Sequence, residues 1–449
     1  MSGERELGRE GRRAAPRAMP GRIAYVNARL LDPATGLDAK GGLITEGEAI
    51  AEFGPQIGQG RIPEGATIVD CRGHCLAPGL VDMRVQLREP GEERKETIET
   101  ASRSAAAGGV TAMVGLPNTD PPIDDVAVVE FVARRAREVK QVKIFAYAGV
   151  TKGLKGDDLT EMGLLSEAGA VGFTDGVKAL SNARVMRRAL TYARAFGALI
   201  IQHPEEPRLA EGGAMNDGEV AMRLGLSGIP PMAETIMLER DLRLVEMTGG
   251  RYHAAHVSTA MGIEQIRRAK AAGLPVTCDT APPYFALNET AVGDYRTFAK
   301  LSPPLRAEED RRAVVTALKD GTIDVIASDH APHDQDSKRL PFTQAEFGVV
   351  GLETILPLTL ELVHGGHVPL LAALAALTYK PADLLGLPLG RLKPGAAADL
   401  VIFDLDRPWR IEVDRFKSKS KNSPFDLHPV QGRVMRTVVD GRTVHWHEG

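Results

Sequence analysis

The chain has 449 residues, of which 43% are hydrophobic and 25% are charged. This length and composition allow a large buried core, and they fit one large domain with a smaller appendage. The net charge of -4 gives no general attraction to phosphate backbones or to acidic membranes, which argues against nucleic acid or a membrane as a partner.

The two ends of the chain differ in composition from its middle. Residues 1–21 are rich in Arg, Glu and Gly without an apolar segment, which predicts a disordered extension and not a secretory signal. Residues 22–76 and 390–449 alternate apolar and polar positions between Gly, Pro and Asp turns. We expect these two segments to join into one small β-sandwich domain. The three cysteines form no zinc-ribbon or disulfide pattern, so a reducing cytoplasm is expected.

Between these ends, short apolar runs alternate with longer segments of helical periodicity. Buried parallel strands read as continuous apolar runs, and the intervening segments repeat apolar residues at three-to-four spacing. Eight such units predict an α/β fold, a (β/α)8 TIM-like barrel, assigned to residues 77–389. The eight runs are residues 80–87, 111–117, 143–149, 170–176, 199–204, 252–258, 276–282 and 324–332.

Four of these runs end in side chains that can bind a metal or carry a proton. They are Asp175, His203, His256 and Asp329. The carboxyl ends of barrel strands meet at one mouth, where active sites are found. Asp175, His203 and His256 would be a three-ligand set that leaves zinc an open position for water. The alternative interpretation is that the histidines are satisfied core side chains and that Asp175 caps its strand.

A series of motifs spread over nearly the whole chain points to one protein family. Together they resemble the class I dihydroorotases of the amidohydrolase superfamily. The resemblance implies a zinc-dependent cyclic amidohydrolase of pyrimidine biosynthesis that interconverts N-carbamoyl-L-aspartate and dihydroorotate. The motifs are the segment at 78–111, PNTDP at 117–121, FTDG at 173–176, HPEE at 203–206, HVST at 256–259, KLSPPLR at 300–306, SDHAPH at 328–333 and the tail at 391–404.

The resemblance assigns roles around the metal. Asp175 would be the carboxylate that bridges two zinc ions, and His203 and His256 would hold the second ion. Asp329 would accept a proton from the metal-bound water and return it to the leaving nitrogen. The alternative for Asp329 is a turn-forming residue ahead of His-Ala-Pro.

The resemblance also implies a substrate site. Arg88 and Asn118 would grip the substrate carboxylate, arginine because its fork matches a carboxylate. Ser302 and His333 would contact the substrate as well. Two departures weaken these contacts: Ser302 stands where the family usually has Asn, and residues 281–284 read Ala-Pro-Pro-Tyr instead of Thr-Pro-His-His. For Arg88 the alternative is a solvated loop charge.

The first strand departs most from the family. The pattern Asp-x-His-x-His reads Asp82-Met83-Arg84-Val85-Gln86 here. Residues two apart point to the same face of a strand, so Arg84 and Gln86 are expected at the barrel mouth. Arginine cannot bind a metal, and a glutamine oxygen is a poor zinc ligand. We expect one zinc ion at most, or none, with the Arg84 guanidinium in the place of the first ion and paired with Asp175 or Asp329. The alternative is that Arg84 turns out to solvent.

Two functions stay open on this basis. The first is a dihydroorotase, with reduced activity if the incomplete metal site limits it. The second is a non-catalytic homologue that acts as a structural partner of aspartate transcarbamoylase, a role known for dihydroorotase-like chains without metal ligands. A homo-oligomer is expected in either case.

Two charged segments can be interpreted without assigning them a catalytic role. The segment KSKSKN at 417–422 lacks the aromatic residues of a nucleic-acid patch, so a flexible basic loop is predicted. The two glutamates of HPEE either orient the preceding histidine or are solvated loop charges.

Overall fold

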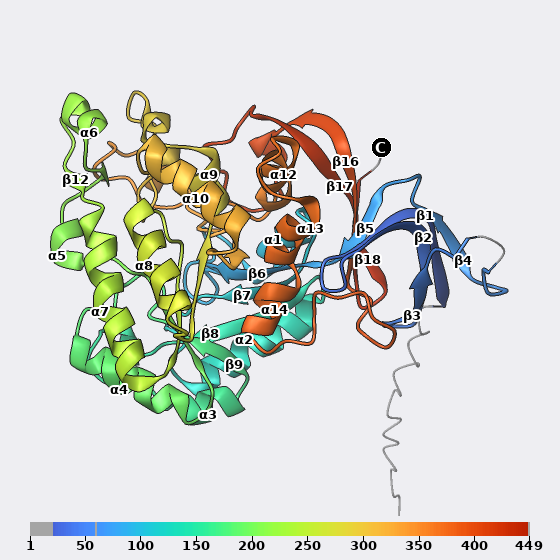
Figure 1. Cartoon of the computed structure of the whole chain (residues 1–449), viewed down its shortest axis with the longest axis horizontal. Helices are drawn as coiled ribbons and strands as arrows, with labels where there is room; N and C mark the ends of the chain where they lie inside the picture. Colours follow the sequence, from blue (N-terminus) through green and yellow to red (C-terminus); the bar gives the residue numbers. More distant parts are fainter. Residues whose placement is uncertain (1–20, 59–60, 448–449) are drawn as a thin grey trace, which may run out of the picture.

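Eight parallel strands form the barrel that the sequence predicts (Figure 1). The computed structural model describes residues 21–58 and 61–447, so the predicted disordered extension lies almost wholly outside the described residues. Each barrel strand begins within one residue of a predicted apolar run. The strands are β6 (Leu80–Val85), β7 (Val110–Gly115), β8 (Lys143–Ala148), β9 (Ala170–Phe173), β10 (Leu199–Gln202), β13 (Arg251–Ala254), β14 (Val276–Thr280) and β15 (Val325–Ile326), paired in this order.

The barrel closes between its last strand and its first. Val85 forms a parallel bridge with His330, and the Gln86 N–H donates to the His330 carbonyl at 2.9 Å. Earlier in the same two segments, Asp82 Oδ1 accepts a hydrogen bond from the Ser328 N–H at 3.1 Å. This closure brings the segment after β6 beside the segment after β15, and both segments carry expected site residues.

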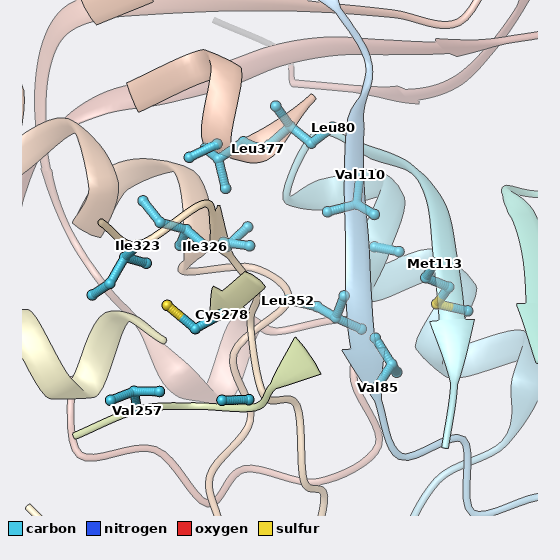
Figure 2. Packing of buried hydrophobic residues seen from close by; sticks show 14 of the residues in the cluster. Leu80, Val85, Val110, Met113, Val257, Cys278, Ile323, Ile326, Leu352 and Leu377 are labelled. Atoms are coloured by element: carbon cyan, nitrogen blue, oxygen red, sulfur yellow. The ribbon is translucent and has the colours of Figure 1, made fainter. Parts of the chain in front are cut away.

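The side chains between the barrel wall and its helices form the largest hydrophobic cluster (Figure 2). Leu80 and Val85 of β6, Ile326 of β15 and Leu377 of α13 (Leu370–Leu377) belong to it, and none is more than 1% exposed. Full burial of such a side chain contributes about 1.5–3 kcal/mol to stability. The cluster therefore gives the strand ends a rigid frame.

Helices follow most strands and cover the barrel (Figure 1). Their starts are set by local chemistry: Thr97 and Thr100 form a capping box on the first helix, and Thr259 caps the helix after β13. The helices of six or more residues are α1 (Ile98–Ala107), α2 (Val126–Val139), α3 (Met162–Glu167), α4 (Ala183–Arg194), α6 (Glu219–Leu224), α7 (Met232–Thr248), α8 (Ala260–Ala271), α10 (Glu308–Asp320), α12 (Ile355–His364), α13 and α14 (Tyr379–Leu384).

The two chain ends join in one mixed sheet beside the barrel (Figure 1). The antiparallel pair of β5 and β16 links them, with Leu400 opposite Pro78. The sheet runs in the order β18-β17-β16-β5-β1-β2-β3, and β4 also pairs with β1. Its strands are β1 (Arg22–Asp32), β2 (Leu37–Glu46), β3 (Ala49–Gly54), β4 (Thr67–Asp70), β5 (Cys75–Pro78), β16 (Leu400–Arg410), β17 (Pro429–Val439) and β18 (Arg442–Trp446).

The lysine- and serine-rich segment between β16 and β17 is not a free loop, and that prediction is wrong. Ser418, Ser420 and Asn422 are 2%, 5% and 2% exposed. The buried carboxylate of Glu96 and the half-buried carboxylate of Glu353 accept hydrogen bonds from this segment. The sequence could not reveal this, because both acceptors lie more than 60 positions away along the chain.

No helix among the described residues is both long enough and apolar enough to cross a membrane.

Candidate active site

A cavity of about 250 Å³ lies at the carboxyl ends of the barrel strands. Its walls come from the segments after β6, β7, β9, β10, β13, β14 and β15, and the last of these includes residues 346–348. Asp175 is not among the lining residues. The expected site residues that line the cavity are Arg84, Gln86, Arg88, Asn118, His203, His256, Ser302, Asp329 and His333.

Three of these side chains form a chain of hydrogen bonds. His203 Nδ1 lies 2.7 Å from His256 Nε2, and His256 Nδ1 lies 3.1 Å from Asp329 Oδ2. Burial, together with the charge of Arg84, lowers the pKa of His256 to about 4, so its imidazole is neutral at pH 7. A neutral ring donates from one nitrogen and accepts at the other. His256 therefore donates to Asp329 and accepts from His203.

The Arg84 guanidinium completes this chain from the other side. Its Nε donates to Asp329 Oδ1 at 2.8 Å, and its Nη2 lies 3.4 Å from both the Gly176 carbonyl and His256 Nε2. Both side chains are largely buried, at 2% and 12% exposed. Burial alone would raise the pKa of Asp329, but its contacts with His256 and Arg84 hold that pKa far below its ordinary value. Arg84 thus pairs with Asp329 and not with Asp175.

Both carboxylate oxygens of Asp175 accept hydrogen bonds from Thr151, a residue that was not expected in the site. Its Oδ1 accepts from the Thr151 N–H at 2.9 Å, and its Oδ2 accepts from the Thr151 hydroxyl at 2.5 Å. Burial still raises the pKa of Asp175 above its ordinary value. Thr151 follows the end of β8 in the sequence. Its position just after a barrel strand was the only sign in the sequence that it could belong to the site.

This arrangement does not fit a zinc ion. Two nitrogens bound to one tetrahedral zinc at about 2.0–2.1 Å would lie about 3.3 Å apart. His203 Nδ1 and His256 Nε2 are only 2.7 Å apart and share a hydrogen, and a guanidinium nitrogen lies 3.4 Å from the same His256 atom. Across residues 21–58 and 61–447, no three His, Cys, Asp or Glu side chains are grouped to hold a metal. The expected ligands Asp175, His203 and His256 do not meet at one point.

Arg88, a candidate for substrate binding, is buried and hydrogen-bonded, and so it is not a solvated loop charge. Arg88 is 6% exposed; its Nη1 donates to Glu92 Oε2 at 2.7 Å and its Nε to the Pro332 carbonyl at 3.1 Å. Its Nη2 lies 3.2 Å from His333 Nε2, and that ring nitrogen lies 2.8 Å from the Phe347 carbonyl. Arg88 and His333 are therefore packed together in one wall of the cavity.

The remaining candidates also contact one another. Asn118 Nδ2 donates to Gln86 Oε1 at 3.1 Å. Ser302 Oγ lies 3.4 Å from His203 Nε2, and Glu205 Oε1 lies 3.5 Å from the same nitrogen. Of the two interpretations of the HPEE glutamates, the position of Glu205 agrees with an orienting contact to His203.

Three site residues have strained backbones. Arg88, His256 and Asp329 adopt φ values of 62°, 39° and 49°, which few residues other than glycine adopt. Such strain persists only where the surrounding contacts fix it, and it is common at functional sites. The sequence carries little signal for it, because none of the three is glycine, and aspartate and histidine adopt positive φ only somewhat more often than other residues.

The sequence analysis also missed the wall formed by residues 346–348. Lys300 donates to the carbonyls of Thr343 and Ala345, at 3.1 and 2.7 Å. Lys338 donates to those of Glu346 and Gly348, at 2.7 and 3.1 Å. Burial lowers the pKa of Lys300 to about 8 and that of Lys338 to about 7. Lys338 therefore holds this wall by its backbone, and Lys300 holds the residues that directly precede it.

Comparison with known proteins supports the resemblance seen in the sequence. A dihydro-orotase-like family model matches residues 73–261, and an amidohydrolase family model matches residues 234–445. The chain is 50% identical over 426 residues to a dihydroorotase of Wolbachia sp. subsp. Drosophila simulans (strain wRi), covering 94% of this chain and 96% of that protein. It is 48% identical over 429 residues to a dihydroorotase of Anaplasma phagocytophilum (strain HZ), covering 94% and 95%.

A solved structure of similar fold is the L-hydantoinase (dihydropyrimidinase) from Arthrobacter aurescens. The TM-score is 0.84 at 26% identity, and the match covers 95% of this chain and 96% of that chain. This likeness extends over both the barrel and the mixed sheet.

Proposed function

The chain belongs to the dihydroorotase family, cyclic-amide hydrolases of pyrimidine biosynthesis, and from this we propose that it interconverts N-carbamoyl-L-aspartate and dihydroorotate. The observation that carries the proposal is full-length similarity at 50% identity, joined to one cavity that holds the implied substrate and proton-transfer residues. We further propose that the reaction takes place in the cytoplasm, in keeping with three buried free thiols.

Substrate recognition is the best-supported part of this proposal. Arg88 would bind the substrate carboxylate through its guanidinium, whose orientation Glu92 and the Pro332 carbonyl fix. Asn118 and His333 would complete the contact from the neighbouring walls of the cavity. A buried, pre-oriented arginine loses little freedom when it binds an anion, so affinity for the substrate pair is expected to be retained.

Proton transfer would fall to Asp329, which is a weak base in this environment. A carboxylate whose pKa lies far below the working pH accepts a proton poorly. We propose that the site works without a stoichiometric zinc ion, since the donor geometry does not fit one. Its turnover is then expected to be far slower than that of a site with an activated water.

A second candidate is a non-catalytic structural partner of aspartate transcarbamoylase. Two observations favour it: the Arg84–Asp329 ion pair neutralises the base, and the direct His203–His256 hydrogen bond uses both imidazoles. Partner binding requires only the fold, which the ion pair leaves intact.

A restored metal pair tests the two candidates. The double variant Arg84→His/Gln86→His is expected to raise dihydroorotate turnover at least about a hundredfold over the wild-type chain, because it supplies two imidazole ligands and frees Asp329. The matched control Arg84→Met/Gln86→Met removes the same side chains without adding ligands, and no gain is expected from it.

The wild-type result decides between the candidates. Measurable wild-type turnover, abolished by Asp329→Asn, supports the enzyme. No wild-type turnover, together with co-purification of aspartate transcarbamoylase with the intact chain, supports the structural partner. If the double variant is as slow as its control, the proposal that the first strand limits catalysis fails.

A further inference from the structure

The segment 416–423, called the strap below, crosses from the mixed sheet to the mouth of the barrel. It lies between β16 and β17 and contacts the segment after β6 and the segment after β15. We propose that the strap positions the substrate-binding wall, and that Asn422 is the positioning residue. The ligand part of this proposal rests on the proposed function.

Every polar atom of the Asn422 side chain is used inside the protein. Its Nδ2 donates to the carbonyls of Ala331 at 2.9 Å and Gly348 at 3.0 Å. Its Oδ1 accepts from the His333 N–H at 3.0 Å. The backbone carbonyl of Asn422 accepts from the Val350 N–H at 2.9 Å. One side chain thus joins the two backbone segments that form one wall of the cavity.

The other end of the strap binds the segment after β6. The Ser418 hydroxyl donates to Glu96 Oε2, and the Lys419 N–H donates to Glu96 Oε1 at 3.1 Å. The Ser420 hydroxyl donates to the Lys95 carbonyl at 2.6 Å. Lys95 lines the cavity. The strap therefore spans from the segment that carries Lys95 to the segment that carries His333.

The orientation of the Arg88 guanidinium depends on the position of the backbone that Asn422 binds. It donates to the Pro332 carbonyl and lies against His333, so the backbone that Asn422 holds is the surface on which its guanidinium lies. His333 in turn contacts the Phe347 carbonyl, next to the Gly348 carbonyl that Asn422 also binds. Removal of the Asn422 amide would leave the Ala331 carbonyl and the His333 N–H without partners, and the Gly348 carbonyl would keep only its bond from Lys338, so the wall would relax. The guanidinium would then lose its fixed direction toward a bound carboxylate.

Hydrogen exchange and ligand binding on the intact chain test this role. Asn422→Ala is expected to raise amide exchange in peptides covering residues 331–336 and 344–350 and to weaken dihydroorotate binding, measured by calorimetry, about tenfold. Asn422→Asp keeps the acceptor for the His333 N–H but loses both donated bonds. Because its second carboxylate oxygen would face the Ala331 and Gly348 carbonyl oxygens, it is expected to raise exchange in both peptides, as Asn422→Ala does.

Asn182→Ala is the matched control. Asn182 caps α4 through its side-chain oxygen, outside the cavity, so its loss destabilises the fold without touching the wall. The control is expected to leave exchange at both peptides and the dissociation constant unchanged.

The outcomes separate the two proposals. Unchanged exchange in Asn422→Ala, or equal weakening of binding by Asn182→Ala, overturns the positioning role. Absence of dihydroorotate binding by the wild-type chain overturns the proposed function instead, and the exchange pattern then still decides the role of Asn422.

Discussion

Arg84 is buried at the barrel mouth, and its guanidinium meets one carboxylate of the two that were expected there. Thr151 donates to both oxygens of Asp175 through its N–H and its hydroxyl. Asp329 instead accepts from the Arg84 Nε through one oxygen and contacts His256 through the other. Strand alternation accounts for the inward direction of residues 84 and 86. The choice of carboxylate could not be predicted, because Thr151 lies 67 positions from Arg84 and belongs to no motif.

The Arg84–Asp329 pair leads to a stability prediction. Arg84→Met keeps the length of the side chain but leaves a buried carboxylate without its cation, and we expect a loss of about 3 kcal/mol in the free energy of unfolding. Urea denaturation of Arg84→Met, Asp329→Asn and the double variant would measure it. The loss of unfolding free energy in the double variant should be smaller than the sum of the two single-variant losses by about 2 kcal/mol. Additive losses would show that the two side chains do not interact.

At the scale of elements, each of the eight predicted apolar runs overlaps a barrel strand. Apolar periodicity is a local property, so it survives in a single sequence. The strap was mispredicted because its burial depends on Glu96 and Glu353, which come from other elements. A polar segment reads as a loop until its distant partners are known.

The strap also leads to a pH prediction. Burial raises the pKa of Glu353 to about 7, from an ordinary value of 4.5. Between these two pH values the folded state holds a proton that the unfolded state has released, so the free energy of unfolding falls as pH rises. Glu353→Gln keeps the shape of the side chain and cannot ionise. We expect the stability of the wild-type chain to fall by about 2–3 kcal/mol relative to this variant between pH 4.5 and 7, measured by urea denaturation. Parallel stability curves would refute this.

At the scale of the whole molecule, the two chain ends complete the fold and also reach the site. Their joining in one sheet was predictable, because chain ends tend to lie close together. Lys143 of β8 ties the barrel to this sheet through Asp399 and Asp440, the latter at 2.7 Å. The strap extends the same connection to the cavity. The mixed sheet therefore acts on the active-site wall as well as on stability.

We propose that the Arg84 guanidinium takes the place of a metal ion in this dihydroorotase-family barrel. The decisive experiment is the zinc content of the intact purified wild-type chain, with Arg84→His/Gln86→His measured beside it after growth in zinc and dialysis against metal-free buffer. We expect the wild-type chain to retain far less than one zinc ion per chain, its melting temperature to be unchanged by a chelator, and the variant to bind zinc. One or more zinc ions retained per wild-type chain, with a melting temperature that a chelator lowers, would show that a metal occupies the site despite Arg84.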